Sequence, residues 1–322
     1  MSVTAENIGK KAVSIANSIV NLIVLAVILL LAAFGCYALW DSDQIYQAAD
    51  AARYEIYKPT VEDEGKSFGE LQEINPEVFG WLTVYGTNID YPVAQGIDNM
   101  KYVNTNAEGD YSLSGSIFLD CGNSRDFSDF NSIVFGHHME KQTMFGEIGL
   151  FADQSYFDAR SYGNLYYGSK DHGLEFFAFL HGDAYDTTVF TAGIQGREAQ
   201  QRYLDDLLDK AIVTRDIGVT AEDRIVLLST CSAESTNGRD ILAAKITDEL
   251  YADAFELNEI NNTGTQATVE EQGIWADLPG LLRIGAAVLV LLVMAIVIYH
   301  KNHKRRHLPE EEGFEKEKKQ KE

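Results

Sequence analysis

The sequence predicts a mainly β domain, either a barrel or a sandwich, preceded by a short helical segment and flanked by two membrane-spanning helices. Two observations lead to this prediction. Short runs rich in aromatic and β-branched residues alternate with Gly, Asn and Asp between residues 78 and 246. Two long apolar runs, at residues 22–40 and 284–299, lie on either side of that region.

A helix that crosses a bilayer requires about 20 apolar residues. The first run has nearly this length, and the second reaches it when Leu281 and Leu282 extend it across Arg283. A cleaved signal peptide is the alternative for the first run, but no small-x-small cleavage site follows Trp40. We therefore expect an uncleaved anchor. The alternative for the second run is a buried core helix. Arg283 near one end can reach the headgroups, and the basic cluster at residues 301–306 favours a membrane stop.

The charges beside the two runs predict that both termini are cytoplasmic. Lys10 and Lys11 precede the first run and the basic cluster follows the second, and positively charged flanks stay inside the cell. Residues from about 41 to 280 are then extracellular. From Asp41 to Asp277 there are 15 Lys and Arg against 42 Asp and Glu, a net charge of −27. This field disfavours nucleic acids as partners.

The segment before the β region is expected to be helical. Apolar residues recur at helical spacing over 45–56, Pro59 and Gly65 interrupt the pattern, and a helix resumes over 68–74. Helical turns are expected within 140–158, and an amphipathic helix over 196–211. The predicted strands are 78–86 with its turn, 89–93, 116–119, 132–135, 165–167, 174–181, 186–190, 225–228 and 241–246.

These patterns divide the chain into seven consecutive parts. They are a cytoplasmic N-terminus (1–17), a transmembrane helix (18–40), an N-terminal helical segment (41–74), the β domain (75–253), a polar linker (254–279), a second transmembrane helix (280–300) and a charged cytoplasmic tail (301–322).

Cys231 is the most informative residue, because the apolar run 224–231 delivers it at the C-terminal end of a predicted strand. Arg239 opens the next apolar strand, so a long hairpin would bring the two residues together. A cysteine reacts as the thiolate, which requires a nearby cation or imidazole. The alternatives are a buried core thiol or a disulfide with Cys121, since Cys36 lies inside the first apolar run.

Two histidines end another predicted strand, directly after Gly136. Adjacent strand residues point to opposite faces, which argues against a metal shared by His137 and His138. A histidine that faces a cleft is suited to acid/base chemistry, whereas the alternative is a pair of surface histidines in a turn. No Cys-x-x-Cys or Cys/His zinc spacing occurs, so we expect no structural metal.

Several motifs resemble those of sortases. The run Leu-Leu-Ser-Thr-Cys at 227–231, followed by Arg239, is similar to the Thr-Leu-x-Thr-Cys…Arg signature of that family, with Leu227 where Thr is usual. Phe135-Gly136-His137 resembles the Gly-His element. The chain resembles class B sortases in particular over about residues 45–250. The resembling segments occur in the same order as in that class, at 75–82, 89–93, 98–99, 115–120, 136–139 and 143–146.

The resemblance implies an eight-stranded sortase-type β-barrel with N-terminal helices and a helix before the cysteine strand. Cys231 would form an acyl-enzyme, His137 would be the acid/base, and Arg239 would hold the substrate carbonyl or oxyanion. Thr230 would position the substrate. The implied reaction cleaves a C-terminal sorting motif, of the LPxTG or NPxTx kind, in a secreted protein. The protein is then transferred to an amine of a cell-wall peptide or a pilin lysine, and the implied reaction needs no metal and no organic cofactor.

Other interpretations stay open at this point. A second span is more typical of class C sortases, which polymerise pilins, so the sequence does not decide between wall anchoring and pilin assembly. A non-catalytic bitopic scaffold or receptor with a sortase-like domain is one alternative function. A cysteine hydrolase that uses water as the acceptor is another. For Arg239, the alternative is a surface arginine paired with Asp240 or Glu234.

Overall fold

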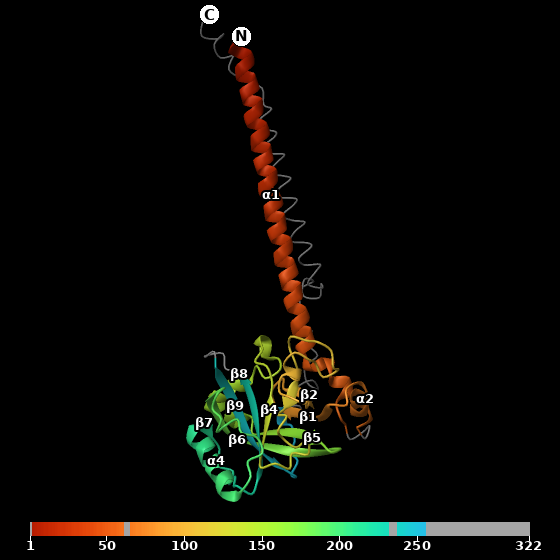
Figure 1. The fold of residues 1–322 in the computed structure, drawn as a ribbon, viewed down its shortest axis with the longest axis vertical. Coiled ribbons are helices and arrows are strands. Elements are labelled where there is room, and N and C mark those ends of the chain that lie inside the picture. The colour runs from red at the N-terminus through yellow and green to blue at the C-terminus, as the bar shows by residue number, and fades with distance from the viewer. Residues whose placement is uncertain (1, 61–64, 232–236, 256–322) are drawn as a thin grey trace, which may run out of the picture. The chain divides into compact units, whose positions relative to one another are not determined.

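The computed structural model describes residues 2–60, 65–231 and 237–255 (Figure 1). One compact unit, Asp43–Thr268, contains every strand within those residues. Helix α1 (Ser2–Ala49) begins outside this unit, and its last turns, from Asp43, belong to it.

Helix α1 contains a stretch that is long and apolar enough to cross a membrane. This stretch is Lys11–Ala49, and its most apolar window has a mean hydropathy of 2.9. By length and composition it agrees with the first predicted span. The second predicted span, at 280–300, lies outside the described residues.

The predicted helix over 45–56 ends earlier than expected, at Ala49. Asp50 is extended and its side chain accepts a hydrogen bond from the backbone N of Ala52, so it caps a new turn and α1 cannot continue. Two 3₁₀ turns follow, η1 (Ala51–Arg53) and η2 (Glu55–Tyr57), and then helix α2 (Lys66–Ile74).

Eight strands close into a barrel, as predicted. The sheet order is β5-β1-β2-β3-β4-β8-β9-β6-β7, and a pairing of β5 with β6 closes the ring and leaves β7 on the outside. The β2–β3 and β4–β8 pairs are parallel, and the others are antiparallel. The strands are β1 (Val78–Val84), β2 (Asp90–Ala94), β3 (Ile117–Leu119), β4 (Asn131–Phe135), β5 (Tyr162–Tyr167), β6 (Lys170–Asp183), β7 (Ala211–Thr214), β8 (Arg224–Cys231) and β9 (Gly238–Thr247).

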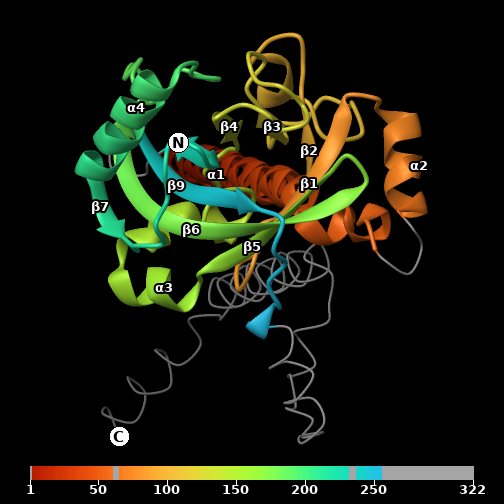
Figure 2. The ribbon, with the colours of Figure 1, turned by 90° about the horizontal axis from the view of Figure 1, so that it is seen from below.

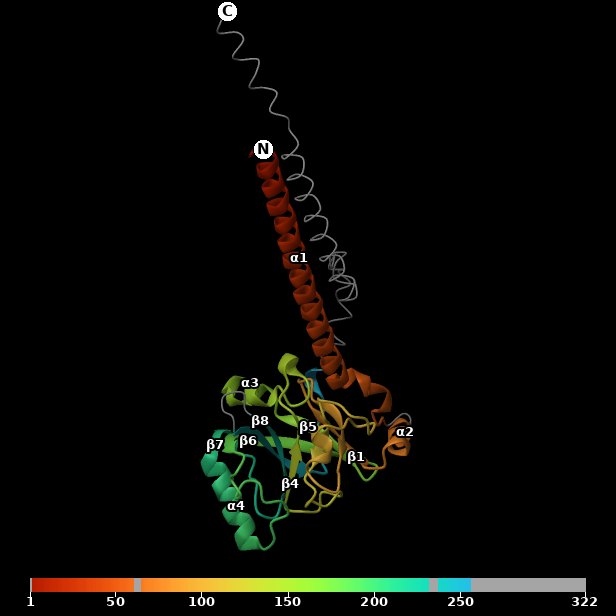
Figure 3. The same ribbon diagram turned by 45° about the horizontal axis from the view of Figure 1, so that its top comes forward.

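Helix α4 (Arg197–Lys210) covers one outer face of the barrel, and α2 lies on the opposite side (Figures 2 and 3). Strand β6 supplies both the barrel interior and the layer beneath α4. Phe176 and Phe179 belong to the interior cluster, whereas Phe177 and Leu180 belong to the cluster that includes Leu204 of α4. A bulge between residues 176 and 178 shifts the alternation, so Phe177 and Ala178 both belong to the cluster beneath α4 and Phe179 returns to the interior.

The predicted strand at 186–190 was wrong. The side chain of Asp186 accepts hydrogen bonds from the backbone N atoms of Thr188 and Val189, and its other oxygen accepts one from Lys210 Nζ at 2.8 Å. Asp186 therefore holds these residues in a turn. The helical turns predicted within 140–158 are present as η4 (Glu140–Gln142), η5 (Ile148–Ala152) and α3 (Gln154–Ala159), and 3₁₀ turn η3 (Lys101–Val103) follows β2.

Candidate active site

Three of the predicted site residues lie at one edge of the sheet because of how β4, β8 and β9 pair. Strands β4 and β8 are parallel and aligned so that Phe135 opposes Ser229, and Gly136 N donates to Ser229 O at 3.1 Å. His137 therefore follows β4 at the level where Cys231 ends β8. In the antiparallel β8–β9 pair, Cys231 is the direct partner of Arg239, which confirms the proximity expected from a hairpin.

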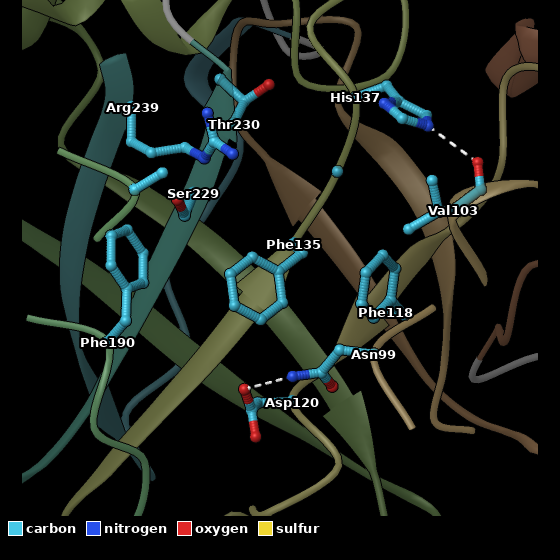
Figure 4. A pocket seen from close by; sticks show the side chains of 12 residues that line it. Asn99, Val103, Phe118, Asp120, Phe135, His137, Phe190, Ser229, Thr230 and Arg239 are labelled. Atoms are coloured by element: carbon cyan, nitrogen blue, oxygen red, sulfur yellow. Dashed lines mark hydrogen bonds between the residues drawn. The ribbon is translucent and has the colours of Figure 1, made fainter. Parts of the chain in front are cut away.

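A pocket of about 430 Å³ opens beside these strand ends (Figure 4). His137, Thr230 and Arg239 all line it. An aromatic wall completes the lining. The rings of Phe118 and Phe135 are 5.4 Å apart between centroids, and Phe190 stacks on the other side of Phe135 at 6.2 Å. The pocket thus combines polar groups at the strand ends with an apolar wall suited to side chains of a bound peptide.

His137 is held through both its ring and its backbone. Its Nε2 lies 2.8 Å from the carbonyl O of Val103, in η3. A carbonyl oxygen only accepts hydrogen bonds, so Nε2 carries a proton, and Nδ1 is the nitrogen left to exchange one. Phe145 N donates to His137 O at 3.0 Å. The neighbouring His138 does not line the pocket, and its Nδ1 is buried without a partner among the described residues.

Arg239 is half-buried, and its guanidinium extends over the end of β8 (Figure 4). Its Nη1 donates to Gly238 O at 3.0 Å, and it forms no ion pair within residues 2–60, 65–231 and 237–255. The alternative partner Asp240 instead accepts a hydrogen bond from His181 Nδ1 at 2.8 Å. Glu234 lies outside the described residues. Within the described residues, the other guanidinium donors of Arg239 have no partner, and the side chain lines the pocket.

The hydroxyls of Ser229 and Thr230 are the remaining polar groups at the end of β8. Both residues line the pocket, are at most 2% exposed, and have no hydrogen-bond partner for their hydroxyls in the described chain. A buried hydroxyl without a partner costs about 1–3 kcal/mol, which a bound peptide group can recover. The sequence indicated Thr230 through the resemblance and gave no role to Ser229.

Other features of the pocket were missed or only partly seen in the sequence. The Val103 carbonyl has no sequence signal, because every residue has one. Asn99 was part of a motif without an assigned role; its Nδ2 donates to Asp120 Oδ2 at 2.7 Å, and both residues line the pocket.

Cys121 is a free, exposed thiol outside this site. The segment after β3 runs antiparallel to β4, and Asp120 N donates to Ile133 O. Cys121 therefore lies near the N-terminal end of β4, whereas His137 follows its C-terminal end. Along β4, about five residues separate the position beside Cys121 from that of His137 and Cys231, which is roughly 16 Å at 3.3 Å per residue. A disulfide spans at most about 7 Å between Cα atoms, so the alternative of a Cys121–Cys231 bridge does not fit.

The chain is similar in sequence and structure to several sortase B proteins. No protein-family profile matches it. It is 32% identical over 183 residues to sortase B of Listeria monocytogenes, covering 55% of this chain and 72% of that protein. Sortase B from the type II pilus of Streptococcus pneumoniae is 49% identical, with a TM-score of 0.50 over 56% of this chain and 99% of that one. The Staphylococcus aureus sortase B–substrate complex is 28% identical, with a TM-score of 0.58 over 64% and 98%.

Proposed function

Because the chain belongs to the sortase B family, whose members are cysteine transpeptidases, we propose that its active site is the pocket at the ends of β4, β8 and β9. Cys231 is the nucleophile, His137 the acid/base, and Arg239 the donor to the carbonyl oxygen. The observation that carries this proposal is the convergence of the three strand ends, set by the parallel β4–β8 pair and by the Cys231–Arg239 register.

The reaction runs in two steps. The thiolate of Cys231 attacks the scissile carbonyl, the peptide C–N bond breaks, and the leaving amine takes a proton from the His137 imidazolium. An acceptor amine then attacks the thioester, the C–S bond breaks, and the amine's proton passes to the neutral His137. This step forms the new amide bond and returns Cys231 as the thiolate beside the His137 imidazolium. Negative charge develops on the carbonyl oxygen in both steps, and the guanidinium of Arg239 stabilises it.

The arrangement of His137 supports this assignment. Its Nε2–H is engaged by the Val103 carbonyl, so one tautomer is favoured and Nδ1 serves as the nitrogen that exchanges protons. Arg239 adds a fixed cation directly across from Cys231, which favours the thiolate. Thr230 and Ser229 line the pocket, and their hydroxyls, which have no partner in the described part of the chain, can bind the peptide backbone.

The substrate is a secreted protein with a C-terminal sorting motif of the NPxTx or LPxTG kind, and its apolar residues pack on the wall formed by Phe118, Phe135 and Phe190. A substrate complex of a related sortase B supports this class of substrate. The acceptor is an amine, either of a cell-wall peptide or of a pilin lysine. The 49% identity to a sortase B from a type II pilus favours the lysine.

The enzyme works at the outer surface of the cell membrane. Helix α1 anchors it through the apolar stretch Lys11–Ala49. The basic residues at 301–306, together with the second apolar run, keep the C-terminus in the cytoplasm beside the N-terminus.

A product assay tests this function. The full-length protein in detergent is incubated with a sorting-motif peptide, with and without an amine acceptor such as triglycine or a lysine-containing pilin peptide, and the products are identified by mass spectrometry. We expect an amide-linked product that requires the amine. Hydrolysis unaffected by the amine would indicate a cysteine hydrolase, and the absence of any cleavage would favour the non-catalytic scaffold.

A further inference from the structure

The last turns of α1 contact the loop that follows His137. These turns belong to the same compact unit as the barrel. Tyr46 OH donates to Glu140 Oε2 at 3.3 Å, and Lys141 Nζ lies 4.0 Å from the centroid of the Tyr46 ring. Ala49 is completely buried, in the same hydrophobic cluster as Tyr91 and Met144. The end of the helix is therefore packed against the catalytic unit and is more than a tether.

A buried hydroxyl, that of Tyr91, also connects this helix end to the loop. Tyr91 lies on β2 and is 2% exposed. Its hydroxyl donates to Ala49 O at 2.8 Å and accepts from Met144 N at 2.9 Å. Burial raises the pKa of Tyr91 well above its ordinary value, so the hydroxyl stays protonated and makes both hydrogen bonds at any physiological pH.

The loop needs such support because its backbone is strained. Lys141, Gln142 and Met144 have φ values of 59°, 59° and 53°, in the left-handed region that residues with a Cβ rarely adopt. Such conformations persist only where the surroundings hold them. The hydrogen bond from Met144 N to Tyr91 is one contact of this kind.

The loop in turn fixes the backbone of both histidines. Phe145, the residue after Met144, donates its N–H to His137 O at 3.0 Å, and Met144 forms a bridge with His138. A shift of Met144 therefore moves the hydrogen bond that holds His137. The hydroxyl of Tyr91 does not line the pocket, so it acts on the histidine only through the loop.

We propose that Tyr91 is a positioning residue, through which the membrane-proximal end of α1 holds the loop at 139–146 and thereby the backbone of His137. The proposal rests on the function assigned above to His137. It implies that loss of the Tyr91 hydroxyl lowers kcat while leaving KM unchanged, because the peptide-binding wall is untouched.

The test compares Tyr91→Phe with a matched variant, Tyr167→Phe, in the full-length protein. Tyr167 is also buried, and its hydroxyl accepts from Arg224 Nη1 at 2.8 Å, at the first residue of β8 and the end opposite Cys231. On a sorting-motif peptide, we expect kcat of Tyr91→Phe to fall about tenfold with KM unchanged, since a small displacement of a catalytic group has effects of this size or larger. Tyr167→Phe should keep the wild-type kcat.

Equal kcat values for wild type and Tyr91→Phe would overturn the proposal. Equal losses of kcat in Tyr91→Phe and Tyr167→Phe, matched by equal falls in melting temperature, would also overturn it. Tyr46→Ala tests the second contact between α1 and the loop, at a half-buried position; a lower kcat would support the role of this helix end, and an unchanged kcat would leave Tyr91 as its only link to His137 among the described contacts. If the wild-type protein itself forms no product, the failure lies in the proposed function and not in the role of Tyr91.

Discussion

Replacing Arg239 with lysine separates a catalytic from a surface role for this residue. Its guanidinium lines the pocket, and one of its nitrogens donates to the carbonyl of Gly238. No ion pair holds it within the residues that the structure describes. Lysine keeps the charge but lacks the planar fork of donors, so only a role that depends on donor geometry is sensitive to the change.

The expected magnitude follows from the loss of one oxyanion donor, which costs about 10²–10³ in kcat. Arg239→Ala removes both donor and charge and should lose about a hundredfold or more. Lysine keeps the electrostatic part, so we expect Arg239→Lys to be at least about tenfold slower. Stability should hardly change, because the hydrogen bond that the guanidinium makes within the described residues goes to the carbonyl of the preceding residue. A bond of this kind on a half-buried side chain is worth about 1 kcal/mol or less.

The assay measures kcat for the amine-dependent product and the melting temperature on the same preparations. Arg197→Lys is the control, because Arg197 begins α4 and forms an exposed ion pair with Glu222, worth about 0–1 kcal/mol. This control should match wild type in both measurements. If Arg239→Lys also matches wild type in both, Arg239 has no catalytic role, and the site depends on Cys231 and His137 alone.

Three further predictions concern histidines and topology. His137→Ala should lose orders of magnitude in kcat/KM and His138→Ala much less, and the reverse order would place the acid/base one residue later. His172 stacks on Tyr167, and its burial lowers its pKa. As the pH drops below about 6.5, the unfolded chain binds a proton at this histidine more readily than the folded protein does, so the free energy of unfolding falls. Between pH 7 and pH 5, the melting temperature of His172→Phe should therefore fall less than that of the wild type. Equal falls in the two proteins would mean that groups other than His172 cause the pH dependence. Protease added to intact protoplasts should digest the catalytic unit and spare tags at both termini, whereas a digested C-terminal tag would refute the second span.

Much of the fold was predictable because local patterns agree with the final structure. The alternation of strand-forming residues and turns indicated a closed β architecture, and the amphipathic run at 196–211 became α4. The errors in the strand prediction have local causes. Asp186 captures the backbone of residues that otherwise have strand composition. Strand β7 (Ala211–Thr214) is only four residues long and directly follows α4, so it gave no separate signal.

The site was only partly predictable, because its geometry depends on pairings distant in sequence. The proximity of Cys231 and Arg239 followed from two consecutive strands, whereas the parallel β4–β8 pair that brings His137 beside them has no local signature. The partners of Tyr91 lie 42 and 53 residues away and are backbone atoms, as is the Val103 carbonyl. Such groups become visible only when the chain is folded.

The most direct test of the mechanism is to locate the acyl group. The full-length protein is incubated with a sorting-motif peptide in the absence of amine, and intact-mass spectrometry with peptide mapping identifies the modified residue. We expect one acyl adduct, on Cys231, and an added amine should remove it. The same adduct should form in Cys121→Ala and should be absent from Cys231→Ala. An adduct on Cys121, or continued turnover by Cys231→Ala, would contradict the assignment of Cys231 as the nucleophile.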